Sequence, residues 1–234
     1  MRRVTFSILP VLVLAVFGLS AQAGQFKTFR GTVTKITDGD TIHFRPNTLK
    51  EGDKDWVIRM ISTDTAETHL PGPGGIYTQG YWGDKGAEKL GKLLSLGETV
   101  EVDSYGVDVH NRVLGRIYKR GNVDVNLEML KSGWAALYII CDKVSCDERT
   151  DYRKACDIAK DRGLGLFNPN KRLPMLPFIF RSIHQKRPLA KFVGNVRTHR
   201  FFDPTDYGKV PLCDRTFFMT KTDAKRAGYV YAGQ

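Results

Sequence analysis

The chain has 234 residues, of which 41% are hydrophobic and 26% charged, the composition of an ordinary globular protein. This length is enough for one core of good size and a small second unit. A long apolar run occurs only at the N-terminus.

The first 23 residues have the pattern of a secretory signal peptide. Arg2 and Arg3 precede an apolar stretch over residues 11–19, and the small-x-small site Ala21-Gln22-Ala23 follows. The apolar stretch is short for a bilayer span, which needs roughly 20 residues. We expect a secreted or periplasmic protein whose mature chain begins at Gly24; the alternative is an uncleaved membrane anchor.

Short strands and helices alternate up to residue 168. Strands are expected at residues 28–36, 41–44, 56–62, 99–103 and 112–118, and residues 70–75 are expected to form a Pro/Gly loop. Helices are expected at residues 84–96, from an Asp124 cap through Lys131, and from a Thr150 cap through Asp161. This order favours a mainly β fold, a closed five-stranded barrel of the OB-fold type with three helices. Such barrels commonly bind nucleic acid on one face.

The positive charge is concentrated in the C-terminal part. The formal net charge is +11, yet residues 24–168 are neutral, and residues 169–234 hold 13 Lys and Arg against 4 Asp and Glu. Such a field attracts a polyanion (nucleic acid, anionic lipid or cell-wall polymer), although a surface that only keeps the protein soluble accounts for it equally well. We expect a loosely packed Pro-rich basic linker at 169–190. Residues 191–234 are expected to form a small basic α/β module, with too few residues for a strong core of its own.

Four cysteines follow the signal peptide, at Cys141, Cys146, Cys156 and Cys213. Export permits disulfides, and four cysteines allow three complete pairings that the sequence does not separate. Cys156 lies on the apolar stripe of the third expected helix, so a buried thiol is the alternative there. The irregular spacings and the lack of a C-x-x-C pair argue against a zinc site.

Carboxylates gather where predicted strands end. Asp40 ends the Asp38-Gly39-Asp40 turn, and Asp64 and Glu67 come at the end of the third strand. Two or three carboxylate oxygens at the mouth of a small barrel, with backbone carbonyls and water, suit calcium or magnesium.

Two arginines accompany these carboxylates. On a period-two count Arg59 shares a strand face with Val57 and Ile61, and Arg112 opens the fifth strand. Guanidinium groups and a metal can neutralise a phosphate while a carboxylate orients or deprotonates water, so these are the parts for phosphodiester cleavage. Each residue also has a simpler interpretation: a hairpin turn, a structural Arg59–Asp64 ion pair, or a surface charge at Arg112. Spacing alone supports only a metal-binding barrel.

Several motifs, in order, resemble those of the thermonuclease (staphylococcal nuclease) family over residues 26–168. Ile36-Thr37-Asp38-Gly39-Asp40-Thr41 resembles its V/I-x-D-G-D-T motif, and residues 59–67 (RMISTDTAE) resemble R-x-x-x-x-D-T-P-E. Asn111-Arg112-Val113-Leu114 matches Y-G-R-x-L in the Arg and the Leu. Residues 125–135 and 152–167 resemble the family's two later helical segments.

The resemblance implies a calcium-dependent nuclease of the OB-fold that hydrolyses DNA and RNA and leaves 3′-phosphate ends. It implies that Asp40 and Asp64 ligate calcium through their side chains and Thr65 through its carbonyl. It also implies phosphate binding by Arg59, a water held by Glu67 as base or orienting group, and transition-state stabilisation by Arg112. The alternatives are a non-catalytic OB-fold nucleic-acid-binding protein and a surface module whose basic tail binds an anionic polymer.

Two departures from the family pattern affect the site. Ala66 replaces the usual proline, which would loosen the turn before Glu67, and His110-Asn111 replaces Tyr-Gly before Arg112. The module at 191–234 weakly resembles the metal-binding domain of the Ada DNA-repair methyltransferase. It has only Cys213 as a thiol, so we expect no structural zinc there.

Overall fold

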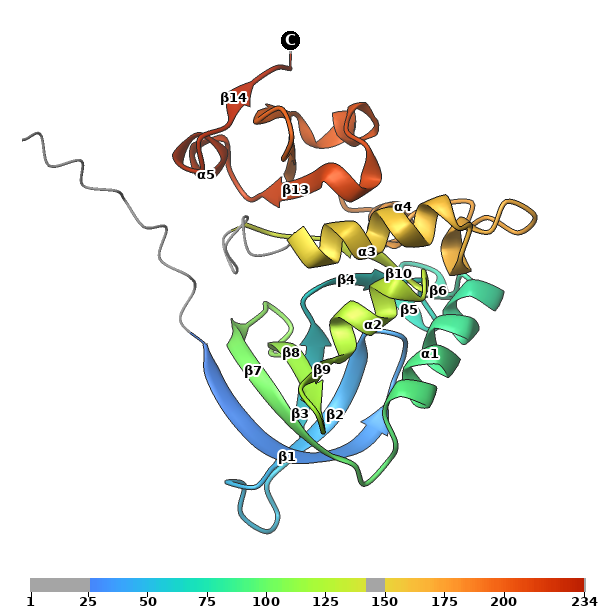
Figure 1. Ribbon diagram of the computed structural model, residues 1–234, viewed down its shortest axis with the longest axis vertical. Helices are drawn as coiled ribbons and strands as arrows, with labels where there is room; N and C mark the ends of the chain where they lie inside the picture. The colour runs from blue at the N-terminus through green and yellow to red at the C-terminus, as the bar shows by residue number, and fades with distance from the viewer. Residues whose placement is uncertain (1–25, 142–149, 234) are drawn as a thin grey trace, which may run out of the picture.

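Five strands close into a barrel. The computed structural model describes residues 26–141 and 150–233, and its barrel strands are β1 (Lys27–Ile36), β2 (Thr41–Pro46), β3 (Trp56–Met60), β7 (Thr99–Val107) and β8 (Val113–Lys119). They are hydrogen-bonded in the order β3-β2-β1-β7-β8, and the parallel pairing of β3 with β8 closes the barrel (Figure 1). The short strand β9 (Val123–Asp124) adds to β8. The expected mainly β fold with a five-stranded barrel is confirmed.

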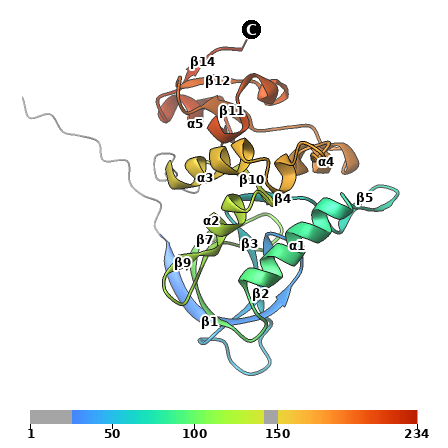
Figure 2. The ribbon, with the colours of Figure 1, turned by 45° about the vertical axis from the view of Figure 1, so that its right-hand side comes forward.

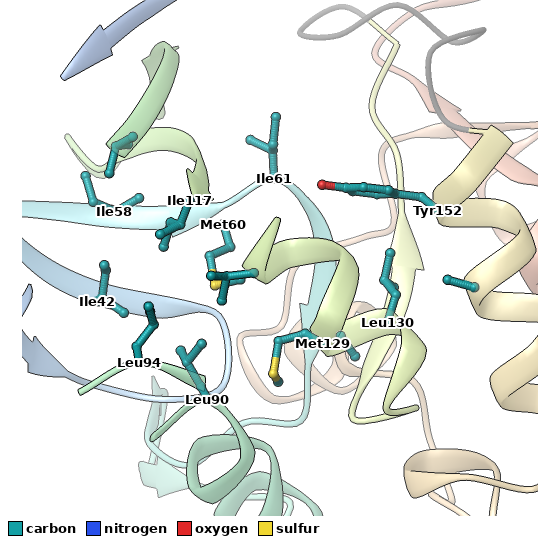
Figure 3. Close-up of a cluster of buried hydrophobic side chains, with 14 of the residues drawn as sticks. Ile42, Ile58, Met60, Ile61, Leu90, Leu94, Ile117, Met129, Leu130 and Tyr152 are labelled. Atoms are coloured by element: carbon teal, nitrogen blue, oxygen red, sulfur yellow. The ribbon is translucent and has the colours of Figure 1, made fainter. Parts of the chain in front are cut away.

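Apolar side chains from these strands fill the barrel (Figure 3). Ile58 and Met60 of β3 are buried among them, so alternation leaves Arg59 on the opposite face. Arg59 shares that face with Val57, as the period-two count predicts, but Ile61 does not follow the count, because it is buried in the core. The strand ends at Met60 because Ser62 has a positive φ of 62°, which takes Ile61 out of the alternation.

Three helices cover the end of the barrel: α1 (Tyr81–Leu93), α2 (Val125–Lys131) and α3 (Thr150–Asp161). Leu90 of α1, Met129 of α2 and Tyr152 of α3 contribute to the shared core (Figure 3). Asp124 caps α2 as expected, because its Oδ1 accepts the Leu127 N–H at 3.0 Å. Its Oδ2 accepts the Tyr152 hydroxyl at 2.6 Å, which joins α2 to α3.

Two strand pairs lie outside the elements expected from the sequence. β4 (Ser62–Thr65) pairs antiparallel with β10 (Ala135–Tyr138), so the expected strand at 56–62 is divided between two sheets. The Pro/Gly loop contains a small hairpin of β5 (Leu70–Gly72) and β6 (Gly75–Tyr77). The β4–β10 pairing joins segments far apart in the sequence, which local periodicity does not reveal, whereas each strand of the β5–β6 hairpin has only three residues, too few for a period-two pattern.

The segment expected as a linker contains structure. A 3-10 turn, η2 (Gly165–Phe167), precedes it, and helix α4 (Pro177–His184) occupies its middle. Pro177 is the first residue of this helix, where its missing N–H costs no hydrogen bond. Phe178 stacks on Tyr138 of β10 with ring centroids 5.6 Å apart, so α4 is packed on the preceding part of the chain rather than loosely attached.

The C-terminal residues form a small sheet with one helix. The strands β11 (Phe192–Asn195), β12 (Arg200–Phe202), β13 (Arg215–Phe218) and β14 (Val230–Tyr231) lie in the order β13-β11-β12-β14. Helix α5 (Lys221–Arg226) and the 3-10 turns η3 (Pro204–Lys209) and η4 (Leu212–Asp214) complete the expected α/β module.

This module is fastened to the rest of the chain (Figure 2). A Cys156–Cys213 disulfide joins α3 to η4, which decides one of the pairings that the sequence left open and excludes a Cys156 thiol. The Phe217 N–H donates to the Ile139 carbonyl at 2.8 Å, and Arg153 donates to the Cys213 carbonyl at 2.9 Å. Cys146 and the expected signal peptide lie outside the described residues. Within the described ranges, no helix has the length and apolarity needed to cross a membrane.

Candidate active site

Asp40, Arg59 and Asp64 form a buried chain of ion pairs at one end of the barrel. Arg59 Nη1 lies 2.6 Å from Asp40 Oδ2, and Arg59 Nη2 lies 2.9 Å from Asp64 Oδ1. The Thr65 N–H donates to Asp40 Oδ2 at 2.8 Å, which ties the turn after β1 to strand β4. Four residues singled out in the sequence therefore lie together.

The turn between β1 and β2 places Asp40. Asp38 Oδ1 accepts the Asp40 N–H at 3.0 Å, a side-chain turn that Asp favours. Gly39 packs directly on Thr65, because a Cβ there would lie 2.9 Å from the threonine side chain. Burial, followed by the nearby charge of Asp40, raises the pKa of Asp38 to about 7. Each residue of the D-G-D motif thus has a separate structural role.

Glu67 follows β4 in a turn held by its own backbone. Its N–H donates to Gln79 Oε1 at 3.1 Å, and its carbonyl accepts the Gln79 N–H at 2.8 Å and the Thr78 hydroxyl at 3.1 Å. Gln79 Nε2 also donates to the Met175 carbonyl at 2.7 Å. These bonds constrain the turn at the point where Ala66 lacks the stiffness of proline.

Gln79→Ala removes two of these hydrogen bonds and tests their role. We expect the free energy of unfolding to fall by about 1–3 kcal/mol, because the Glu67 N–H and the Met175 carbonyl lose their partner. Gln185→Ala is the control, since the Gln185 side chain makes one long 3.4 Å bond to the Pro71 carbonyl. An equal free energy of unfolding in wild type and Gln79→Ala would contradict this role.

Arg112 lies apart from the buried ion pairs. Its Nη2 lies 2.7 Å from Asp108 Oδ2, and its side chain is 32% exposed. Asn111 has a positive φ of 59°, a conformation that favours Gly and that Asn tolerates, so this substitution preserves the loop. His110 is exposed beside it.

One cavity of about 770 Å³ connects these groups. Its wall includes Asp40, Arg59, Glu67 and Arg112, so all the predicted charged residues except Asp64 line the same space. Tyr138, Phe178 and residues as late as Met219 complete the wall. The cavity therefore lies between the barrel mouth and the C-terminal part of the chain.

The structure adds an arginine that the sequence analysis does not identify. Arg181 of α4 places Nη1 2.5 Å from Glu67 Oε1 and Nη2 2.7 Å from Asp64 Oδ1. No local motif marks it, because its partners are 114 and 117 residues away in the sequence. The only signal in the segment is Pro177, which indicates a helix start.

In this cluster, burial disfavours the charged form of each side chain, whereas neighbouring opposite charges favour it. Burial raises the pKa of Glu67, and Arg181 partly offsets this by favouring the carboxylate. For Arg59 burial opposes the charged form, yet Asp40 and Asp64 leave its pKa above the usual value. Both guanidinium groups therefore stay charged and compensate the carboxylates.

One carboxylate oxygen in this cluster is suited to bind a hard divalent cation. Asp64 Oδ2 is buried and has no hydrogen-bond partner among the described residues, and such an oxygen is a suitable ligand. Across residues 26–141 and 150–233, no three His, Cys, Asp or Glu side chains are grouped as metal ligands. A cation here would thus rely on two carboxylates, a backbone carbonyl and water.

Comparison with known proteins gives a family and several relatives. Residues 57–169 match the staphylococcal nuclease homologue family. The chain is 32% identical to Endonuclease YhcR of Bacillus subtilis over 204 residues, which cover 86% of this chain and 16% of that protein. It is 33% identical to Probable endonuclease LCL3 of Yarrowia lipolytica over 134 residues, covering 48% of this chain and 57% of that protein. The chain spans less than two thirds of either relative.

Proposed function

We propose that this chain, whose residues 57–169 match the staphylococcal nuclease homologue family, is a calcium-dependent endonuclease acting on DNA and RNA. The observation that supports this most is the shared cavity, in which Asp40, Arg59, Glu67 and Arg112 face one space. Carboxylates and guanidinium groups around one cavity suit the binding and hydrolysis of a phosphodiester.

The proposed metal ligands are the Asp40 and Asp64 carboxylates and the Thr65 carbonyl. A bound calcium ion would supply charge neutralisation at the phosphate. Asp40 and Asp64 are held for this role by Arg59 and by the Thr65 N–H. Calcium accepts flexible oxygen coordination with several waters, which suits a site with few protein ligands.

The chain's own side chains carry the proposed hydrolysis. Glu67 orients a water or takes its proton as the water oxygen attacks phosphorus. Arg59 binds a phosphate oxygen, and Arg112 leaves Asp108 to stabilise the pentacoordinate transition state. The bond from phosphorus to the 5′ oxygen breaks and that oxygen gains a proton, which gives a 3′-phosphate and a 5′-hydroxyl end.

Secretion is part of the proposal and rests on the sequence. Arg2, Arg3 and the Ala21-Gln22-Ala23 site form the expected signal peptide, and export suits the Cys156–Cys213 disulfide. We place the mature enzyme outside the cytoplasm, either secreted or periplasmic.

Cleavage of single-stranded DNA by the mature protein tests the function. We expect cleavage with calcium, none with a chelator, and loss of activity in Asp64→Asn because that change weakens the proposed ligand set. Gel-shift binding measured in parallel separates catalysis from binding. If wild type binds DNA and does not cut it with calcium or magnesium, the non-catalytic binding protein is the better account.

The basic C-terminal segment is proposed to add salt-sensitive affinity. Arg187 and Lys191 line the same cavity as the catalytic residues, so they lie where a phosphate backbone would pass. Deleting residues 169–234 is not a clean test, because it also removes Arg181 and Cys213, which contact the barrel part.

Arg187→Gln with Lys191→Gln tests this contribution directly. For single-stranded DNA we expect the slope of log K against log salt to decrease by roughly 1.4, since each lost phosphate contact accounts for about 0.7. Lys50→Gln with Arg120→Gln is the matched control, because both side chains are exposed and do not line this cavity. An unchanged slope in the first variant would rule out these phosphate contacts.

A further inference from the structure

Arg181 reaches the proposed active site from outside the family-matched residues 57–169. Its guanidinium joins two carboxylates, Asp64 at 2.7 Å and Glu67 at 2.5 Å. The Arg181 side chain is 25% exposed, that of Asp64 1% and that of Glu67 14%. These pairs are therefore largely desolvated, so the Coulomb attraction within them is stronger than in surface ion pairs, and removing one partner leaves a buried charge uncompensated.

Helix α4 is held so that this contact is maintained. The Phe178 ring lies 5.6 Å from Tyr138 and 5.5 Å from Phe217 between ring centroids, which fixes its N-terminal turn. His184, at the other end, lies 4.3 Å from the Tyr77 ring by the same measure. Arg181 is thus carried by a helix anchored at both ends and is not a mobile surface side chain.

Asp64 is shared between two cations. Its Oδ1 accepts Arg59 Nη2 at 2.9 Å and Arg181 Nη2 at 2.7 Å, whereas its Oδ2 is buried with no hydrogen-bond partner among the described residues. A divalent cation on Asp64 would lie close to a second positive charge, and like charges at this range in a partly buried site repel strongly.

We propose that Arg181 is a further residue of this active site, a built-in counter-ion that competes with the divalent cation for Asp64 and positions Glu67. The inference rests on the proposed function, because it takes Asp64 as a metal ligand. Cation binding would weaken the Arg181–Asp64 pair while the Arg181–Glu67 pair keeps the carboxylate oriented. The cost of separating Arg181 from Asp64 lowers the affinity of the site for the metal.

Isothermal titration of the full-length mature protein with calcium chloride alone tests the competition. Arg181→Gln is expected to bind calcium roughly tenfold more tightly than wild type, since it removes the repulsion and the competing pair. Arg181→Lys, which keeps the charge, is expected to stay within about threefold of wild type. Arg187→Gln controls for general charge, because Arg187 lines the same cavity without pairing to these carboxylates.

Thermal unfolding with and without calcium gives a second readout that also verifies folding. Calcium is expected to raise the Tm of Arg181→Gln more than that of wild type, as linkage requires for the tighter binder. Asp64→Asn identifies the site and is expected to abolish the shift.

The outcomes separate this inference from the proposed function. Equal calcium affinities of wild type and Arg181→Gln, with binding lost in Asp64→Asn, would overturn the competition and leave the metal site standing. Calcium binding by neither protein would overturn both. An equal gain of affinity in Arg187→Gln would reduce the effect to general electrostatics and also overturn the competition.

Discussion

Replacing Glu67 with Gln is expected to lower kcat for DNA cleavage by about 10²- to 10⁴-fold, the usual contribution of a group that transfers or directs a proton. The amide keeps the size of the side chain and an oxygen that can accept from Arg181, so the Arg181 contact and the fold are expected to persist. KM should change little, because in the proposed mechanism Glu67 acts on the water rather than on the phosphate. Steady-state cleavage of single-stranded DNA in calcium measures both constants.

Glu128→Gln serves as the matched control. Glu128 also pairs with a cation, Lys131 at 2.7 Å, but it lies on α2 and does not line the cavity. Its kcat should equal that of wild type. A Glu67→Gln enzyme that keeps more than about a tenth of the wild-type kcat would remove Glu67 from the proposed chemistry.

Removing the Cys156–Cys213 disulfide is expected to lower the free energy of unfolding by roughly 4 kcal/mol. The bond spans 57 residues and joins α3 to the small C-terminal module. That module has few residues for a core of its own, so the cross-link limits how far it separates from the barrel part in the unfolded chain. Denaturant unfolding of Cys156→Ala with Cys213→Ala, compared with wild type, measures the difference.

The single variants provide the internal control. If the cross-link is responsible, Cys156→Ala, Cys213→Ala and the double variant should each lose a similar amount, because either change breaks the same bond. Additive losses would instead indicate independent cavities at two buried positions. A total loss below about 1 kcal/mol would contradict a stabilising role for the disulfide.

The Glu67 and disulfide predictions concern two parts of the chain that both line one cavity. The carboxylates Asp40, Asp64 and Glu67 come from the part of the chain before residue 169, while one wall of the cavity and Arg181 come from residues after 169. The disulfide and the Phe217–Ile139 backbone bond hold those parts together. Loss of structure in the C-terminal module should therefore disturb α4, and with it the contacts of Arg181 with Asp64 and Glu67.

The sequence by itself determined the barrel and most of its charged site. Alternating apolar residues and the Asp38-Gly39-Asp40 turn predict the β1–β2 hairpin, because period two and turn chemistry are local properties. The Asp124 cap and the positive-φ Gly163 likewise mark helix ends through local backbone preferences. Asp40, Arg59 and Asp64 were predicted as one group through ordered motifs, and the structure places them in contact.

Only the tertiary structure decided what depends on distant partners. The count that grouped Ile61 with Arg59 was wrong, because the positive φ of Ser62 follows Ile61 and this side chain packs in the core with Ile58 and Met60. The pairing of Cys156 with Cys213 and the contact of Arg181 with Asp64 join segments 57 and 117 residues apart. Such contacts leave no local periodicity, since they arise when α4 and the C-terminal sheet pack on a barrel that local patterns have already specified.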